Sequence, residues 1–353
     1  MTFEEFIMQA REMNASDIHL TVGAPTVVRV NGELRKYTEL SDQVVNRTIL
    51  SILSAEQEKM LTEGKDIDFS FELKNGARQR VNVFRQSGKL AACIRLLNAE
   101  IPTLEELKMP PVLLEFAKKR RGLVLVTGPT GAGKSTTLAA LMEYINKTRA
   151  CHVITIEDPI EYRYKQEKAT IHQRELGRDV PSFHEALRSA LREDPDIIEV
   201  GELRDLETIS TALTAVETGH LVFATLHTQD AGSTVDRLID VYPENQQQQI
   251  RVQVASTLRA VIVQTLIPRA TGQGRAPATE VMINTPAVSS LIRSGKAHQI
   301  RTVLQSGEKE GMHTLDQDLA RLVNKGTITF EDALVKVQVR EEFEKLCGAR
   351  SSF

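Results

Sequence analysis

Cysteine and long apolar runs are both scarce in this sequence. Its three cysteines, Cys93, Cys151 and Cys347, lie far apart, are odd in number and include no CxxC pair. Such a set supports neither a disulfide framework nor a cysteine-bound zinc site. No apolar run approaches the roughly 18 residues that a membrane-spanning helix requires. We therefore expect a cytoplasmic protein with no zinc site and no transmembrane segment.

A clear excess of basic charge is also missing. The 353 residues carry 44 Lys and Arg against 47 Asp and Glu, a formal net charge of −3. Chains that wrap nucleic acid usually carry a basic excess, so no direct nucleic-acid partner is expected, although the total leaves room for a local basic patch. At the start of the chain, Phe3, Phe6, Ile7 and Ala10 follow a helical spacing within an acidic segment. This indicates an amphipathic first helix rather than a signal peptide.

The length is comfortable for two or three domains, and the pattern of residues suggests where they divide. Residues 1–98 combine helical segments with short β-rich runs, and the hairpin dipeptides Asn31-Gly32 and Asn75-Gly76 separate such runs. We predict a small α+β domain here, followed by a proline-containing linker at 99–110. The β-rich runs cover residues 18–22, 25–30, 67–73 and 79–84.

From residue 111 to about 270 the pattern changes. Strongly apolar strand candidates alternate with helical segments, which is typical of a parallel sheet covered by helices on both faces. The strand candidates are 122–128, 152–158, 195–200 and 221–227, and helical segments include 182–192 and 206–217.

The last part of this core and the C-terminal region read as mostly helical. Ile250, Val254, Leu258 and Ile262 recur at four-residue steps, so we predict one long helix after residue 243. An extended stretch near 275–284 interrupts the helices. We assign residues 271–353 to a mainly helical C-terminal region.

The sequence GPTGAGKST at 128–136 follows an apolar strand and precedes a helix. In that context it predicts a phosphate-binding loop, because its glycines let backbone N–H groups turn towards phosphate oxygens and the helix N-terminus adds its dipole. Lys134 would reach the β- and γ-phosphates of ATP, and the Ser135 hydroxyl would bind Mg²⁺. The predicted nucleotide-binding residues are Gly128, Pro129, Thr130, Gly131, Ala132, Gly133, Lys134, Ser135 and Thr136.

Polar residues follow the other strand candidates of this core. They are Glu157 and Asp158, Glu202, and His227. Ligands of parallel sheets lie beyond the carboxyl ends of the strands, so these side chains should converge on the phosphate loop. We assign Glu202 to orient the attacking water. A glycine precedes Glu202 where nucleotide hydrolases often have Asp, so Mg²⁺ would rely on the loop serine, water and the acidic pair.

The two histidines around the last strand candidate are not expected to share a metal ion. Seven residues of strand place His220 and His227 about 23 Å apart, whereas metal–nitrogen bonds are near 2 Å. His227, at the carboxyl end, is the better candidate for the nucleotide site. Strand geometry alone does not explain the position of His220.

Several motifs in a fixed order resemble the secretion and type IV pilus ATPase family, and within it most closely the retraction motors. They are ASDIHLTVG (15–23), GPTGAGKSTT (128–137), ITIEDPIEY (154–162), DPDIIEVGELRD (194–205) and ETGHLVFATLHT (217–228), and they span most of the chain. The resemblance implies an α/β fold with an N-terminal PAS-like α+β domain, a RecA-like P-loop NTPase domain and a C-terminal helical extension. It also implies a homo-hexameric, ATP-driven ring.

The resemblance also assigns roles to residues. The family's acidic box corresponds to Glu157, Asp158 and Glu161, its catalytic glutamate to Glu202, and its histidine box to His220 and His227. Arginines of the family's N-terminal domain that act on the nucleotide correspond to Arg80 in RQRVNVF and Arg95 in ACIRLL. Such an arginine, brought up by domain closure or by a neighbouring subunit, would neutralise charge on the γ-phosphate.

The function implied is a hexameric Mg-ATP-hydrolysing motor for type IV pilus retraction, pilin disassembly and twitching motility. It would work at the inner face of the cytoplasmic membrane with an inner-membrane platform protein. An accessory or assembly motor of the pilus or of type II secretion is the first alternative. A RecA-like nucleic-acid translocase is the second, and the charge balance and histidine box argue against it. A scaffold that does not hydrolyse ATP is the third, and Lys134, Ser135 and Glu202 argue against that.

A short C-terminal segment bears on the choice between these motors. AVSSLIRS at 287–294 is a weak version of an AIRNLIRE-like motif that is linked to retraction in the family. It follows Pro286, a helix-start residue, and Val288, Leu291 and Ile292 have the spacing of a packed helical face. We expect Ser289, Ser290 and Arg293 to remain exposed.

Overall fold

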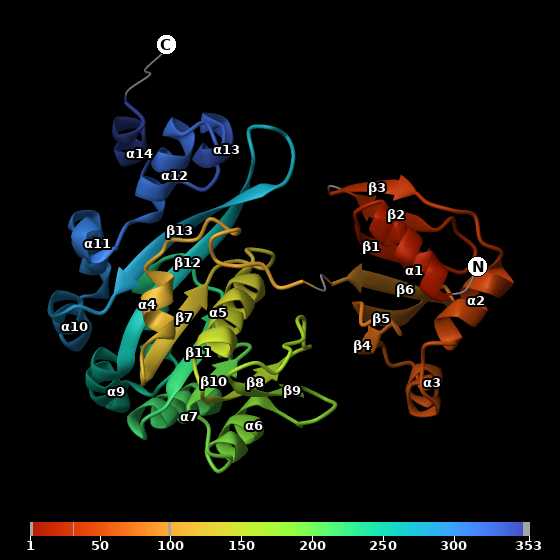
Figure 1. The fold of residues 1–353 in the computed structure, drawn as a ribbon, viewed down its shortest axis with the longest axis horizontal. Helices are drawn as coiled ribbons and strands as arrows, with labels where there is room; N and C mark the ends of the chain where they lie inside the picture. Colours follow the sequence, from red (N-terminus) through yellow and green to blue (C-terminus); the bar gives the residue numbers. More distant parts are fainter. Residues whose placement is uncertain (1–2, 31, 98–99, 349–353) are drawn as a thin grey trace. The chain divides into compact units, whose positions relative to one another are not determined.

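The computed structural model describes residues 3–30, 32–97 and 100–348, and its contacts divide the chain into two compact units. Unit 1 contains the described residues up to Glu100 together with Pro159–Arg163. Unit 2 contains the rest of the described chain. Figure 1 is coloured along the sequence, from red and orange for the N-terminal residues of unit 1 to blue for the last helices of unit 2.

Unit 1 is built on a six-stranded antiparallel sheet in the order β3-β2-β1-β6-β5-β4. The first helix is amphipathic as predicted, because it buries Phe6, Ile7 and Ala10 against the sheet core. The strands are β1 (Ala15–Thr21), β2 (Val27–Val30), β3 (Glu33–Lys36), β4 (Ile67–Glu72), β5 (Arg78–Gln86) and β6 (Lys89–Leu96), and the helices are α1 (Phe3–Glu12), α2 (Asp42–Leu50) and α3 (Ala55–Thr62).

The predicted hairpin at Asn75-Gly76 joins β4 to β5. Gly76 has a left-handed φ of 83°, and the Asn75 side chain accepts a hydrogen bond from the Ala77 N–H at 3.0 Å. Glycine and asparagine suit this turn because one tolerates positive φ and the other bonds to its own backbone. The other predicted hairpin involves Asn31, which lies outside the described residues.

Unit 2 contains a seven-stranded sheet in the order β13-β12-β7-β11-β10-β8-β9. All neighbouring strands pair in parallel except β12 and β13, which are antiparallel. The predicted parallel sheet is therefore present, with an antiparallel strand at one edge. The strands are β7 (Gly122–Thr127), β8 (His152–Glu157), β9 (Thr170–Glu175), β10 (Ile197–Val200), β11 (Leu221–Leu226), β12 (Leu258–Pro268) and β13 (Arg275–Ile283).

Helices cover both faces of this sheet, as the apolar strands require. Along β7, Leu123 and Leu125 join one apolar cluster, whereas Val124 and Val126 join the other. The second cluster includes α4 (Leu113–Ala117) and α5 (Lys134–Thr148). The first includes α6 (Phe183–Ala190), α7 (Leu206–Glu217), α8 (Ala231–Asp240) and α9 (Glu244–Thr257).

Short helices follow the sheet in the C-terminal region, as expected. Those nearest the C-terminus pack on the far ends of β12 and β13 in an apolar cluster centred on Phe343, which is fully buried. The elements are α10 (Pro286–Arg293), η1 (Ala297–Gln299), α11 (Ile300–Ser306), η2 (Glu308–Glu310), α12 (Leu315–Asn324), α13 (Phe330–Leu334) and α14 (Arg340–Leu346). No helix among residues 3–30, 32–97 and 100–348 is both long and apolar enough to cross a membrane.

One predicted element is wrong. The helix expected to run through Ile262 ends at Thr257, and Leu258 begins the 11-residue strand β12. The four-residue spacing of Leu258 and Ile262 fits one face of a helix, but the pairing of β12 with β7 shifts between Leu258 and Ala260, so the two side chains join apolar clusters on opposite faces of the sheet. Because β12 is buried on both faces, its sequence shows no alternation that would have separated the two possibilities. The sequence patterns also missed β9, at the opposite edge of the sheet.

Candidate nucleotide-hydrolysis site

The predicted phosphate loop connects the carboxyl end of β7 to the first turn of α5. Its three glycines adopt backbone angles that other residues rarely adopt, with φ of 139° at Gly128, 78° at Gly131 and 87° at Gly133. Positive φ at these positions curls the backbone so that successive N–H groups can face one anion. The loop is tied to the neighbouring strand, because the Gly128 N–H donates to the Leu226 carbonyl of β11 at 3.3 Å.

Lys134 is folded back over the loop that precedes it. Its ammonium group donates to the Gly128 carbonyl at 2.8 Å and to the Pro129 carbonyl at 3.1 Å. Ser135 lies exposed in the first turn of α5. Lys134 and Ser135 thus place a cation and a hydroxyl at the N-terminus of α5. The helix dipole also favours an anion there.

A residue that the sequence patterns missed supports this loop from β12. Gln264 is 3% exposed, and its side-chain amide bonds to Ala132 in the loop and to Thr137 in α5. No sequence signal marked it, because residues 258–262 were assigned to a helix and a glutamine beyond them has no motif.

Glu202 and His227 meet at the carboxyl ends of the adjacent strands β10 and β11. The Glu202 carboxylate lies 3.0 Å from His227 Nε2 and 2.8 Å from Arg204 Nε. The glutamate side chain is only 17% exposed, compared with 47% for His227 and 63% for Arg204. These three residues line a pocket of about 350 Å³. The structure therefore brings Glu202 and His227 together at these strand ends, and their predicted convergence on the phosphate loop stays a prediction.

The acidic pair lies at the carboxyl end of β8, two strands away from β11. Glu157 is half-buried and accepts hydrogen bonds from the Thr155 hydroxyl at 2.5 Å and from Gln173 Nε2 at 3.1 Å. Asp158 is exposed. Glu161 is half-buried and lies in Pro159–Arg163, the segment that groups with unit 1.

His220 lies at the amino end of β11, so the length of this strand separates it from His227. Its Nδ1 lies 2.8 Å from the Ala215 carbonyl, which can only accept, so Nδ1 carries the proton. The Thr218 hydroxyl lies 3.1 Å from the same nitrogen. The structure thus does not bring the two histidines together, and the catalytic role suggested for His220 stays a prediction.

The two arginines assigned by resemblance lie on neighbouring strands of unit 1. Arg80 on β5 makes an ion pair with Asp68 at 2.6 Å, and Arg95 on β6 makes one with the buried Asp17 at 2.9 Å. Arg80 and Arg95 are directly opposite each other in the sheet. Their side chains are 40% and 62% exposed, respectively.

The oxygen donors at this edge of the sheet suit Mg²⁺. Magnesium prefers oxygen ligands and usually keeps several waters while binding substrate phosphates. The donors are the Ser135 hydroxyl and the carboxylates of Glu157, Asp158 and Glu202. Within the described residues no three His, Cys, Asp or Glu side chains are grouped to hold a metal ion by themselves.

A buried carboxylate binds the backbone shortly after His227. Glu280 on β13 is 2% exposed and accepts from the Ala231 N–H at the start of α8 at 2.7 Å, four residues after His227. It also accepts from the Leu315 N–H at the start of α12 at 3.4 Å. Burial raises the pKa of Glu280 from 4.5 to about 7, and the two backbone N–H groups oppose that rise.

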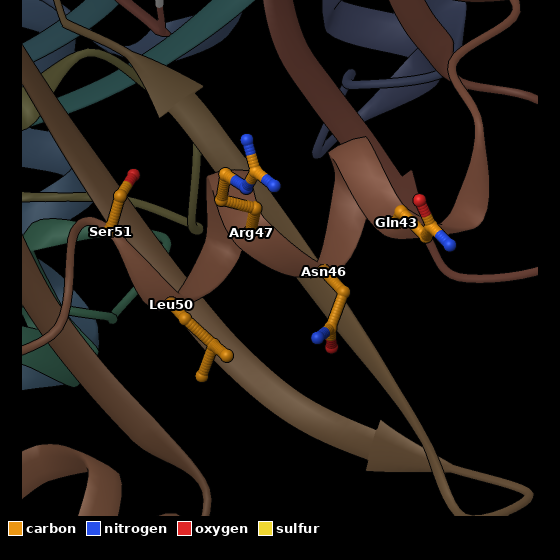
Figure 2. A pocket seen from close by; sticks show the side chains of 5 residues that line it. All are labelled: Gln43, Asn46, Arg47, Leu50 and Ser51. Carbon is orange, nitrogen blue, oxygen red and sulfur yellow. The ribbon is translucent and has the colours of Figure 1, made fainter.

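A second pocket, of about 500 Å³, lies along α2 in unit 1. Figure 2 shows that the residues lining it come from this one helix and the residue that follows it. They are Gln43, Asn46, Arg47, Leu50 and Ser51. These five residues include no pair of opposite charges and no activated nucleophile, so we assign no catalytic role to this pocket.

Comparison with known proteins identifies the family. The family model described as type II/IV secretion system protein matches residues 1–276. The type IV pilus retraction ATPase PilT of Pseudomonas aeruginosa is 47% identical over 97% of this chain and 100% of that protein, and a twitching motility protein of Neisseria gonorrhoeae is 48% identical over 89% and 85%. A crystal structure of the pilus retraction motor PilT with bound ADP has a TM-score of 0.91 at 45% identity, covering 98% of this chain and 99% of that one.

The structural match confirms the predicted fold class, an N-terminal α+β part followed by an α/β ATPase part with C-terminal helices. The matching model covers more than three quarters of the sequence, and both relatives are well above 30% identity over most of their length. The chain therefore belongs to the type II/IV secretion system protein family.

Proposed function

We propose that this chain is a magnesium-dependent ATPase that powers type IV pilus retraction as a homo-hexameric ring. The observation that carries the enzymatic part is the position of Glu202. Its carboxylate is held by His227 and Arg204 at the same edge of the sheet as an intact phosphate loop. The names of the similar proteins support the cellular part, since they are a pilus retraction ATPase and a twitching motility protein.

In this proposal the phosphate loop and Lys134 bind the phosphates, and Ser135 binds Mg²⁺. When bound, the metal would neutralise charge on the phosphates. Glu202 orients the attacking water and accepts its proton. A neutral His227 that donates from Nε2 to one Glu202 oxygen would leave the other free to face water once Arg204 turns away. Arg204 can turn because it is the most exposed of the three.

The remaining assignments are part of the same proposal. Arg80 and Arg95 would leave Asp68 and Asp17 to meet the γ-phosphate of a nucleotide bound in the same or a neighbouring subunit. Glu157, Asp158 and Glu161 would act as the acidic box, and His220 as the second histidine.

The proposed division of the chain has four parts. Residues 1–98 form a PAS-like domain, 99–110 a linker, 111–270 the RecA-like ATPase core and 271–353 the C-terminal helical region. The motor would be cytoplasmic and act at the inner face of the cytoplasmic membrane through an inner-membrane platform protein.

The decisive experiment deletes the gene and counts surface pili. A retraction motor should leave hyperpiliated cells that do not twitch, because pili assemble and are not withdrawn. Bald cells would indicate an assembly motor, and normal piliation with weakened retraction an accessory motor. A strain that carries Glu202→Gln should reproduce the deletion phenotype, since the proposed work comes from hydrolysis. Stimulation of the purified ATPase by single-stranded DNA would instead favour a nucleic-acid translocase.

A further inference from the structure

Gln264 is a buried polar side chain that touches the phosphate loop from a different strand. It lies on β12, which pairs in parallel with β7, and it is 3% exposed. Its Nε2 donates to the Ala132 carbonyl at 2.7 Å, and its Oε1 accepts from the Thr137 hydroxyl at 2.7 Å. Ala132 and Thr137 are themselves 2% and 1% exposed. Both bonds are therefore shielded from water.

The orientation of this amide is fixed by its partners. A carbonyl can only accept, so the Gln264 nitrogen must face Ala132, and the oxygen is left to accept from Thr137. A carboxylate of the same shape would place an oxygen 2.7 Å from the Ala132 oxygen, with no proton between them. An apolar side chain would leave the buried Ala132 carbonyl without this donor. Both changes are expensive in a buried site.

Gln264 also lies against Gly128 and Gly133, the first and last glycines of the loop. A Cβ atom on Gly128 would lie 2.1 Å from the Gln264 carbonyl oxygen. A Cβ atom on Gly133 would lie 2.9 Å from Gln264 Nε2. Two loop glycines, one loop carbonyl and one helix hydroxyl thus all meet Gln264.

We infer that Gln264 is a positioning residue that holds the phosphate loop in its phosphate-binding shape before a nucleotide arrives. It fixes Ala132 and the start of α5, so the loop N–H groups converge on one point without reorganisation. Binding sites that are arranged in advance pay less ordering entropy when the ligand binds. The inference rests on the proposed function only in taking a nucleoside phosphate as the ligand.

The test measures the Kd of the full-length protein for Mg-ADP by calorimetry, alongside its melting temperature. Gln264→Leu should raise Kd by about tenfold or more, the effect of losing one to two buried hydrogen bonds. Gln264→Glu should raise it at least as much because of the opposed oxygens. Thr265→Val is the matched control, since Thr265 is the next residue of β12, is buried and points to the opposite face. The control should keep the wild-type Kd even if it shifts the melting temperature.

The partner residue gives an independent variant in case substitutions at Gln264 prevent folding. Thr137→Val should raise Kd and Thr137→Ser should restore it, because serine keeps the hydroxyl. The effects of Thr137→Val and Gln264→Leu should be less than additive. In steady-state assays KM should rise while kcat changes little, since the loop binds phosphate and Glu202 lies on another strand.

A Kd within twofold of wild type in both Gln264 variants would overturn the inference, as would a loss of kcat at constant KM. A lower melting temperature with unchanged Kd would reduce Gln264 to a structural role. Failure of the wild type itself to bind Mg-ADP would overturn both this inference and the proposed function. Normal piliation and twitching after gene deletion would overturn only the function.

Discussion

The two sides of the candidate site are held in different ways. On the phosphate side, the Gly128 N–H bond to Leu226 and the buried Gln264 amide fix the backbone around three glycines of positive φ. On the carboxylate side, Glu202 is held by the side chains of His227 and Arg204, which are about half exposed or more. The first side is arranged to bind one shape, and the second can exchange partners. This contrast suits an enzyme that binds the phosphates of each nucleotide in one preformed loop but rearranges around water in each cycle.

The largest effects should come from removing one residue on each side. Lys134→Ala should abolish tight ATP binding, because the residue supplies the positive charge at the loop. Glu202→Gln should leave binding intact and lower kcat by about 10²–10⁴, the usual range for a general base. Nucleotide titrations and single-turnover assays separate the two outcomes. Glu207→Gln, an exposed glutamate at the start of α7, is the control and should change neither. Equal loss of binding in both site variants would contradict the division of roles.

A pair of glycine substitutions tests how tightly the phosphate side is fixed. Gly128→Ala would place Cβ 2.1 Å from a backbone oxygen at a φ of 139°, so we expect nucleotide binding to be lost and the melting temperature to fall. Gly131→Ala meets nothing within 4 Å. It should cost only about 1–2 kcal/mol for the left-handed backbone. Similar losses in the two variants would show that the loop can relax and is not held by β12.

The same contrast explains what sequence could and could not predict. The phosphate loop was predictable because its glycines and Lys134 act through local backbone geometry, which leaves a fixed spacing in the sequence. Glu202 and His227 were predictable because each lies within two residues of the carboxyl end of an apolar strand in a parallel sheet. Gln264 was not, since its contacts with Ala132 and Thr137 cross about 130 residues of chain and depend on β12 pairing with β7.

Secondary structure that is decided by contacts between distant segments was likewise not predictable from the sequence. Strands bounded by turns or polar residues were found close to their observed bounds, as with β7 and β11. The boundary between α9 and β12 has no turn or glycine, because the helix ends at Thr257 and the strand begins at the next residue. Only pairing with β7 and β13 decides that Leu258 onwards is extended. The roles proposed for Arg80 and Arg95 likewise rest on resemblance, because no local sequence pattern marks these residues.

The free energy of unfolding should depend on pH through Glu280, the buried carboxylate that accepts from the start of α8, four residues after His227. The pKa of Glu280 is raised from 4.5 to about 7, so at intermediate pH the native state holds a proton that the unfolded chain has released. The stability that this provides is complete below about pH 4.5 and is lost as pH rises through about 7. The loss should total about 3 kcal/mol in the free energy of unfolding.

Denaturant titrations across this range check the expectation. In Glu280→Gln the fall in stability between pH 4.5 and 7 should disappear, because no proton is exchanged. Glu308→Gln, at an exposed glutamate in η2, should keep the wild-type slope. An unchanged slope in Glu280→Gln would mean that other groups produce the pH dependence.

The smallest effect on chemistry is expected at α10, which belongs to neither side of the site. The packed face predicted for it is confirmed, because Val288 and Ile292 are buried and Thr285 caps the helix before Pro286. The expected exposure of Ser289 is wrong. This serine is half-buried and donates to the Ala255 carbonyl of α9 at 3.0 Å, so it is part of the packing.

The last prediction therefore concerns the two residues of α10 that are exposed, Ser290 and Arg293. If α10 transmits force, Ser290→Ala with Arg293→Ala should abolish twitching motility while leaving ATPase rate and ring formation at wild-type levels. Exposed changes of this kind normally alter stability by only about ±0.5 kcal/mol, so folding does not confound the result. Ser256→Ala, at an exposed serine near the end of α9, provides a surface control that should twitch normally. Normal motility in the double variant would leave α10 with a packing role alone, whereas a fall in ATPase rate would tie it to the nucleotide site.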